Sequence, residues 1–504
     1  MDKDLRRDLV LSLAILTVVT LITAWFSSTH YFVDEHYQIL ELMGYKLGLT
    51  ASSDMRWEFH AQVRPWFQPL VYYAISRPLI LLGVTDIFTV TFILRLLTGL
   101  LSLTALTLFA RAILPTIEGE AEKRAFVQYL PLFGFLPYLF VRTSSETFSA
   151  AFFALGLAVA LERRTAARLA LAGLCCGLAF ESRYQTGLMG LGLFAWLAVI
   201  AREKPARLAA FLGGGMAAVL LGALADRWGY GAWAFPPLGY TNVNLVQGVA
   251  AQRFGREPLF AYFWLMPASV FFAITLVLMA GMAAMWLRNA RHPVSWASLP
   301  FVLAHLVIAH KEARFLFPLA ILATSFPVLG FSPRLPRWRA AFACFWQWRT
   351  SWAALAVTAI SVVAMAGFAV YPFGVRPHLP LAQYLYRHGP RTLVSLEPSF
   401  EPYPLFRRPG FVIKRIDEAG LAAMLEQGPA TLITGRPVPP ALPPGTRAAL
   451  LYSEFPFARF GHGQWGADYI AGYEAFSARH RFLRLIPLHW YTLYRVERSA
   501  TIRS

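Results

Sequence analysis

Two short clusters of ionisable side chains lie beside long apolar runs of this sequence. The first follows the opening apolar run and contains Asp34, Glu35 and Glu41. The second separates two later runs and contains His310, Lys311, Glu312 and Arg314. Ionisable groups next to hydrocarbon carry a high desolvation cost, so they usually mark a place that binds or reacts. Carboxylates can act as general bases, and His, Lys and Arg can bind a phosphate.

The first cluster has the pattern of a helix. At about 100° per residue, Asp34, Gln38 and Glu41 would share one face. An apolar set, Ile39, Leu40, Met43 and Leu47, would share the opposite face. The helix is therefore expected to lie flat on the membrane. Its polar face has two interpretations: it is either exposed to solvent, or it carries a pair of catalytic carboxylates.

The second cluster lies between two apolar runs that leave almost no room for a loop. If it is helical, His310 and Arg314 share a face at positions i and i+4, where they could bind a phosphate together with Lys311. Glu312 could then orient one of these cations. The alternative is a short turn whose charged side chains snorkel outward.

Two further stretches contain candidate binding residues. Trp57, Glu58 and Arg64 follow the first cluster, although aromatic residues here could belong to the interfacial belt and Arg64 could meet lipid phosphate. A later loop is rich in amide and aromatic groups of the kind that bind sugars: Asp226, Tyr230, Asn242 and Asn244.

The elements that position these residues are membrane helices. A chain that is 57% hydrophobic and only 15% charged over 504 residues is too apolar to be soluble. About eleven runs are candidate spans, several of them short. They cover residues 9–25, 88–112, 126–141, 148–161, 169–180, 188–200, 208–224, 260–287, 296–309, 315–331 and 352–371.

Charge predicts the orientation of these spans. Lys3, Arg6 and Arg7 precede the first run, which has no cleavage site after it, and the positive-inside rule places this end in the cytoplasm. Later basic loops fall on the same side if residues 70–82 form an interfacial or re-entrant segment. Those loops contain Arg111, Lys123, Arg124, Arg163, Arg164, Arg168, Arg202, Lys204, Arg207, Arg288, Arg291, Arg334, Arg337 and Arg339. Both ionisable clusters are then expected outside.

A second domain is expected at residues 372–504, after a membrane domain at residues 1–371. The composition changes there to short alternating runs separated by Pro and Gly, which predicts a small external α/β domain. Strands are expected at residues 392–396, 411–416, 430–434, 448–452 and 482–494, and a helix at residues 418–426.

Several classes of protein do not fit the sequence. The formal net charge of +18 has no aromatic-interleaved basic groove beside it, so nucleic-acid binding is not expected. Cys175 and Cys176 are adjacent in an apolar run and Cys344 lies in a cytoplasmic loop, which predicts neither a disulfide nor a zinc site. The triplet Gly213, Gly214 and Gly215 lies inside a span and is typical of helix packing.

The order and spacing of these motifs resemble glycosyltransferase family 22, the GT-C mannosyltransferases that extend lipid-linked oligosaccharides and the glycosylphosphatidylinositol core. The similar stretches are His310-Lys311-Glu312 with Arg314-Phe315, Asp34-Glu35 with Gln38 and Glu41, Trp57-Glu58 with Arg64, Arg142 to Glu146, Arg183, and Asp226 to Asn244. They extend over residues 10 to 335. Val33, Arg56 and Pro65 depart from the family's usual residues, which leaves the sugar and acceptor open.

The resemblance implies an all-α polytopic GT-C catalytic domain that inverts the sugar's configuration without a cofactor. It implies a polyprenyl-phosphate mannose donor and a lipid-linked glycan or glycolipid acceptor. Asp34 would be the general base, with Glu35 or Glu41 orienting the acceptor. The phosphate clamp would comprise His310, Lys311 and Arg314, with Arg64 as a further member. The other substrate-binding residues would be Trp57, Glu58, Glu312, Asp226, Tyr230, Asn242 and Asn244.

Other functions remain compatible with the residues alone. A GT-C transferase of another sugar could use paired acids to bind a divalent metal, and a transporter or flippase for lipid-linked sugars could line its path with charges. The external domain could also be a receptor module, although about eleven spans exceed what an anchor needs. The Ala, Leu and Arg content favours a bacterial inner membrane with the site facing the periplasm, over an endoplasmic reticulum membrane with a lumenal site.

Overall fold

The computed structural model describes residues 2–269, 272–331, 352–370, 378–395, 402–439, 441–479 and 490–498. The chain divides into two compact units. The first takes the chain up to Ser27 and from Asp34 through helix α21 (Trp352–Val370). The second takes Ser28–Val33 and the chain from helix α22 (Leu379–His388) onward. The boundary expected after residue 371 lies outside the described residues.

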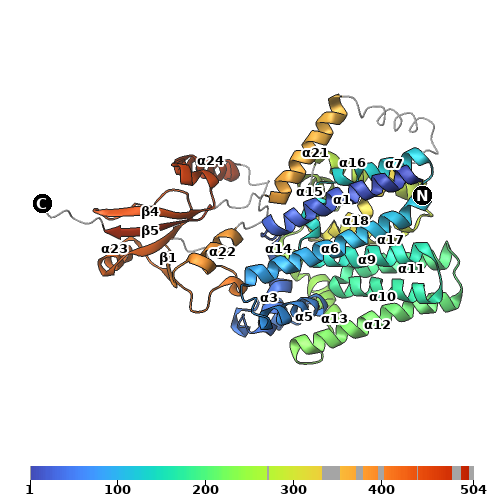
Figure 1. Ribbon diagram of the computed structural model, residues 1–504. Helices are drawn as coiled ribbons and strands as arrows, with labels where there is room; N and C mark the ends of the chain where they lie inside the picture. The colour runs from blue at the N-terminus through green and yellow to red at the C-terminus, as the bar shows by residue number, and fades with distance from the viewer. Residues whose placement is uncertain are drawn as a thin grey trace. The chain divides into compact units, whose positions relative to one another are not determined.

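The first unit consists of helices that follow most of the expected apolar runs (Figure 1). Within the described chain, four helices are long and apolar enough to cross a membrane, and five shorter apolar helices accompany them. The main helices are α1 (Lys3–Phe26), α6 (Ile87–Ile113), α9 (Ser145–Glu162), α10 (Ala166–Ser182), α11 (Gly187–Val199), α12 (Pro205–Tyr230), α16 (Phe272–Arg288) and α17 (Pro293–Val307).

Capping residues determine where several of these helices begin. The Asp86 side chain accepts a hydrogen bond from the Phe88 amide before α6, and Ser144 and Thr165 cap α9 and α10 in the same way. Such caps satisfy amides that have no partner inside the helix. Pro205 occupies the first turn of α12, and Gly231, with φ 73°, ends it.

Helices α10 and α12 pack very closely because both carry glycines at their contact. A Cβ atom on Gly173 would lie 1.9 Å from the Phe211 carbonyl oxygen. A Cβ atom on Gly214 would lie 1.9 Å from the Ala170 carbonyl oxygen. Only glycine permits such backbone approach, so the interpretation of the 213–215 triplet as helix packing is confirmed for Gly214.

Two of the expected spans are not continuous helices in the structure. Residues 126–141 divide into α7 (Glu120–Tyr129), a 3₁₀ turn η4 (Leu130–Leu132) and α8 (Leu136–Phe140). Residues 315–331 divide into a 3₁₀ helix η7 (Ala313–Leu319), α18 (Ala320–Ala323) and α19 (Phe326–Gly330). Prolines at the breaks remove helical hydrogen bonds. The irregular backbone is tolerated because protein surrounds it, as the burial of Leu136 and Leu322 indicates.

Two further segments also differ from uninterrupted spans. The run at residues 260–287 contains α15 (Tyr262–Ser269) and α16 as separate described helices. Residues 70–82, expected to be interfacial or re-entrant, form most of α5 (Phe67–Leu81), a 15-residue helix with Pro78 inside it. Helix α5 packs against α3 (Glu41–Leu47) and α12.

Contacts between loops group at the two ends of the helices, as the charge pattern predicts. At one end Arg124 pairs with Asp2 at 3.2 Å, and Arg164 pairs with Glu203 at 3.3 Å. The expected external loops contact one another in a second group, described below. The basic loop with Arg334, Arg337 and Arg339, and Cys344 with it, lies outside the described residues.

The second unit contains a mixed five-stranded sheet with the order β2-β1-β3-β5-β4. Strand β1 (Thr392–Ser395) is parallel to β2 (Val412–Arg415) and β3 (Ala430–Thr434). Strand β5 (Thr492–Arg498) is antiparallel to β3 and to β4 (Thr446–Ser453). The expected helix is α23 (Glu418–Gln427), whereas α22 and α24 (Gly463–Arg479) were not predicted. The expected start of the last strand lies outside the described residues.

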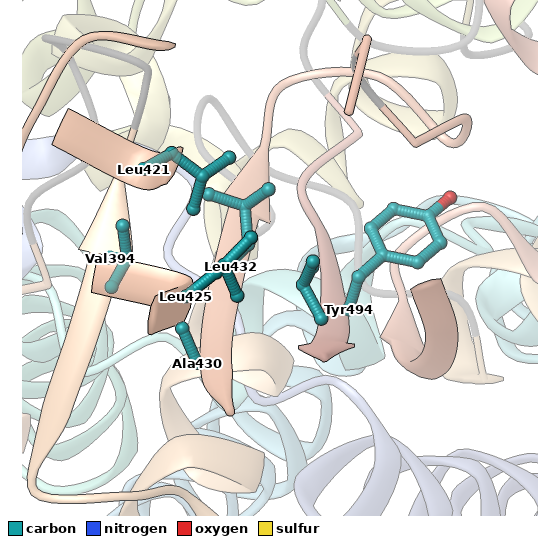
Figure 2. Close-up of a cluster of buried hydrophobic side chains, with 7 residues drawn as sticks. Val394, Leu421, Leu425, Ala430, Leu432 and Tyr494 are labelled. Atoms are coloured by element: carbon teal, nitrogen blue, oxygen red, sulfur yellow. The ribbon is translucent and has the colours of Figure 1, made fainter. Parts of the chain in front are cut away.

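Alternating side chains give this sheet two buried faces. On one face, Leu421 and Leu425 of α23 pack on Val394, Leu432 and Tyr494 (Figure 2). On the other face, Leu381 and Leu385 of α22 pack on Leu393, Ile433 and Leu493. Neighbouring strand residues point to opposite faces, so one strand contributes to both cores.

Candidate active site

The loop expected to be the first external one forms a buried helical segment rather than a surface helix. It consists of α2 (Val33–Glu35), a π-helical turn η1 (His36–Leu40) and α3. Gln38, Ile39, Leu40 and Glu41 are all at most 5% exposed. The expected solvated face is therefore wrong. The π turn also changes the helical period, so Asp34, Gln38 and Glu41 contact three different sets of partners.

Two carboxylates of this segment are enclosed by protein. The Glu35 carboxylate accepts hydrogen bonds from the Thr143 amide at 2.7 Å and the Thr143 hydroxyl at 2.9 Å. Glu41 bonds to His36 Nε2 and to the Thr50 hydroxyl. Both acids are at most 3% exposed. These hydrogen bonds hold the first loop in place. An acceptor-orienting role for Glu35 or Glu41 stays a prediction.

Arg314 lies at the centre of an ionic network that includes Asp34. Its guanidinium donates to Asp34 Oδ2 at 2.6 Å, Glu312 Oε2 at 2.5 Å and Glu146 Oε1 at 3.3 Å. Arg183 donates to the same Glu146 oxygen at 2.9 Å. The Asp34 side chain is 25% exposed and that of Glu146 only 4%. Asp34 is thus the more accessible of these two acids.

The His310 segment differs from the helix considered above. Residues 308–312 are not helical and η7 is a 3₁₀ helix, so His310 and Arg314 do not share an α-helical face. Glu312 instead lies between them, accepting from Arg314 and bonding to His310 Nε2 at 2.9 Å. Burial raises the pKa of Glu312, but Arg314 and His310 lower it further, to about 2. Glu312 therefore orients both side chains and is ionised at neutral pH.

Lys311 is buried and bonded to backbone. Its ammonium donates to the Ile308 carbonyl at 2.5 Å and the Glu257 carbonyl at 3.4 Å. Burial lowers its pKa. These contacts join the loop after α12, which contains Glu257, to the His310 segment. The expected part of Lys311 in a phosphate clamp stays a prediction.

A second network surrounds Arg64. Arg64 pairs with Glu58, which also accepts from Gln38 Nε2 at 3.2 Å. The guanidinium lies over the Tyr240 ring at 5.4 Å, and Gln185 donates to the Tyr240 hydroxyl at 2.5 Å. Burial lowers the pKa of Arg64, but Glu58, Tyr240 and Asp34 raise it above its ordinary value. Arg64 therefore remains protonated at neutral pH.

Asp226 and Tyr230 hold the backbone beside Arg64. The Tyr230 hydroxyl donates to the Arg64 carbonyl at 2.8 Å, and Asp226 accepts from the Trp66 amide at 2.8 Å. Both were expected to bind substrate. In the structure their hydrogen bonds hold the Arg64 segment, and their role in substrate binding stays a prediction.

Three other expected residues lie away from the pocket described next. Trp57, in α4 (Trp57–His60), has the Arg253 guanidinium over its ring at 4.9 Å. Asn244 donates to the Tyr240 carbonyl at 3.2 Å, and Asn242 is exposed in η6 (Asn242–Val246). Within this loop it is therefore Tyr240 that reaches the pocket.

A small pocket of about 20 Å³ adjoins both networks. Among the described residues, three buried donors belonging to its lining residues have no hydrogen-bond acceptor: Arg64 Nε, Arg183 Nε and the Tyr184 hydroxyl. Buried donors normally have partners, so these three are available to a ligand that offers acceptor oxygens. The lining residues are Gln38, Ile39, Arg64, Pro65, Ser145, Ser182, Arg183, Tyr184, Gln185 and Tyr240.

The site expected from the sequence omitted several residues of the pocket and of the adjoining ionic network. Glu146 and Arg183 lie in stretches that resemble the family's motifs, and that resemblance could have included them. Tyr184 and Gln185 form part of η5 (Tyr184–Thr186) and had no distinguishing pattern in the sequence. Tyr240 stood beside the asparagines that were chosen in its place.

The chain has the fold of a solved membrane protein, ArnT. The structure of ArnT from Cupriavidus metallidurans, solved bound to undecaprenyl phosphate, is similar with a TM-score of 0.50 and 13% identity. The match covers 84% of this chain and 92% of that chain. The apo structure of the same ArnT has a TM-score of 0.47 and 12% identity, with the same coverage.

The sequence identifies the family within this fold. The model of the Alg9-like mannosyltransferase family matches residues 11–376, and the chain belongs to this family. No curated protein sequence matches the chain. The family match confirms the resemblance drawn from the two ionisable clusters, and the protein is an integral membrane glycosyltransferase.

Proposed function

We propose that this protein transfers mannose from a polyprenyl-phosphate donor to a lipid-linked glycan or glycolipid. The observation that carries the proposal is the pocket between Arg64 and Arg183, which has three unpaired donors and adjoins the network that holds Asp34. A donor phosphate supplies the acceptor oxygens that these groups lack. The solved complex of ArnT with undecaprenyl phosphate supports a polyprenyl-phosphate donor for this fold.

Asp34 is the general base in this proposal. Arg314 fixes one carboxylate oxygen, and Asp34 makes no other hydrogen bond within the described chain. The second oxygen takes the proton of the acceptor hydroxyl while that hydroxyl oxygen bonds to the anomeric carbon. The bond from the anomeric carbon to the phosphate oxygen breaks, and the phosphate leaves with the electron pair. Attack opposite the leaving group inverts the configuration.

The polar side chains of the site divide into two roles. Arg64, Arg183 and Tyr184 receive the phosphate and stabilise its growing negative charge. His310 and Arg314, joined by Glu312, hold Asp34 in place, so they act on the base more than on the phosphate. This division revises the phosphate clamp of His310, Lys311 and Arg314 inferred from the family resemblance.

The reaction is assigned to the external membrane face, the periplasmic face of a bacterial inner membrane. Supporting this, the site residues belong to loops that the positive-inside rule places outside. The exposed pairs Arg124–Asp2 and Arg168–Glu162 belong to loops that it places inside. An endoplasmic reticulum protein with a lumenal site has the same sidedness.

The test is transfer of labelled mannose from synthetic polyprenyl-phosphate mannose to a lipid extract by purified protein. Asp34→Asn is expected to lower the rate by about 10²–10⁴-fold. Asp4→Asn, at the expected cytoplasmic end, is the matched control and should leave the rate unchanged. Tyr184→Phe should raise the donor KM and leave the acceptor KM unchanged.

The other functions give different results. Loss of transfer with a chelator would indicate the metal-dependent mechanism. Transfer only from a donor with another sugar would correct the mannose assignment. Movement of the lipid-linked sugar across proteoliposomes without a new glycosidic bond would indicate a flippase and overturn the proposal.

A further inference from the structure

Helix α24 of the second unit exposes two aromatic rings on consecutive turns. Trp465 is 62% exposed and Tyr469 is 60% exposed. The opposite face of the helix is packed, since Ala467 and Ile470 are buried. Adjacent large aromatic side chains on a surface usually mark an interaction site, because their exposure is unfavourable in water.

Neighbouring rings fix the orientation of both aromatic side chains. The His462 ring stacks on Trp465 at 4.0 Å with an interplanar angle of 9°. Tyr469 stacks on Trp490 at 5.6 Å, and Trp490 stacks on Phe455 at 4.8 Å. Each exposed ring is therefore supported on one side by a second ring. Preorganised rings lose little conformational entropy when a ligand binds.

A row of polar side chains lies beside the aromatic row. Gln464 and Asp468 are exposed, and Gln464 Nε2 donates to Asp468 Oδ1 at 2.8 Å. Residues four apart on a helix lie on one face about 5–6 Å apart. Each ring is thus preceded in the sequence by a polar side chain: Trp465 by the Gln464 amide, and Tyr469 by the Asp468 carboxylate.

We propose that α24 carries a second glycan-binding site, for a neutral hexose oligosaccharide. The apolar C–H face of a sugar ring packs on a flat aromatic ring, and sugar hydroxyls bond with amides and carboxylates. Trp465 and Tyr469 provide two such rings, and Gln464 and Asp468 provide the polar partners. The Asp468 carboxylate disfavours an anionic ligand, whereas a neutral sugar can donate hydroxyl hydrogen bonds to it.

A lipid surface is the competing ligand, and the composition of α24 disfavours it. Interfacial helices use Lys and Arg to meet lipid phosphate. The turns of α24 that carry the two rings, residues 463–472, contain Asp468 and no Lys or Arg. A protein partner is disfavoured by the polar row, which interrupts what would be a continuous apolar face.

The test measures glycan binding to the full-length protein in lipid nanodiscs by isothermal titration calorimetry. The probes are manno-, gluco- and galacto-oligosaccharides, without any sugar donor. Trp465→Ala and Tyr469→Ala should each weaken binding of the best probe by at least about tenfold. Phe460→Ala, which removes a 74% exposed aromatic outside α24, is the matched control and should bind like wild type.

Three outcomes would overturn this assignment: no binding of any probe by wild type, undiminished binding by Trp465→Ala, or equal weakening by Phe460→Ala. A fourth readout addresses the membrane. Quenching of Trp465 fluorescence by brominated lipids, measured as wild type minus Trp465→Phe, would show that this face contacts lipid and would overturn the proposal. Thermal unfolding of each variant confirms its fold. Because no donor is present, the result is independent of the proposed transfer reaction.

Discussion

The two ends of the helical unit differ in how they hold their charges. At the expected cytoplasmic end, pairs such as Arg168–Glu162 have both side chains about 40% exposed. At the other end, the Arg183–Glu146 pair is almost completely buried. Exposed pairs contribute little to stability, whereas buried charges need a full set of partners to offset their desolvation. The buried pair lies at the end that contains the proposed active site, where a charge that remains buried with its partners can act on a substrate.

The largest effect is expected for Glu146→Gln. This substitution leaves Arg183 and Arg314 without the carboxylate they share, and breaking a buried pair costs about 3–5 kcal/mol. Thermal unfolding in detergent and the transfer assay should both show the loss. Glu162→Gln, the matched change at the other end, should stay within about 1 kcal/mol of wild type. Similar destabilisation by the two variants would contradict the conclusion that buried ion pairs at one end contribute more to stability than exposed pairs at the other.

A smaller effect should appear as a pH dependence at Glu312. Its folded-state pKa of about 2 lies below the ordinary 4.5, so the ionised form is favoured by folding. The corresponding stability is present above pH 4.5 and is lost as the pH falls towards 2, to a total of about 3 kcal/mol. Unfolding temperature measured against pH should fall more steeply for wild type than for Glu312→Gln. Parallel profiles would mean that Glu312 is not held by Arg314 and His310.

The smallest effect is expected for Arg168→Ala. It removes an exposed pair with Glu162, and such pairs contribute about 0–1 kcal/mol. Denaturant unfolding should place this variant within about 0.5 kcal/mol of wild type, with normal transfer activity. Marked destabilisation would show that the exposed end also depends on its ion pairs.

The sequence predicted the helices well where a single periodic run was free of proline. Helices α6, α9 and α12 lie close to their expected positions because hydrophobic length is a strong signal. The runs around Pro131 and Pro318 failed because apolar composition does not distinguish a span from buried irregular segments. In the second unit, α24 was missed because its exposed Trp465 and Tyr469 obscure the apolar periodicity.

The candidate site was predicted in part, for an equally physical reason. Asp34 and Glu312 were found because ionisable residues beside apolar runs stand out. Glu41 was placed with Asp34 because a regular helical period was assumed, and the π turn at His36–Leu40 changes that period. Arg183 and Tyr184 meet Arg64 only through packing of distant helices, which no local pattern encodes.

The long sequence separations in the Arg314 network affect how the protein is made. Glu146 meets Arg183 after 37 residues, but Arg314 follows Glu146 by 168 residues and Asp34 by 280. Chains fold from the N-terminus during synthesis, so Asp34 and Glu146 enter the membrane well before Arg314 exists. Insertion of the segment that begins at η7 is therefore the step that completes the site. A ribosome-bound chain that ends before this segment holds an acid pair without its central cation.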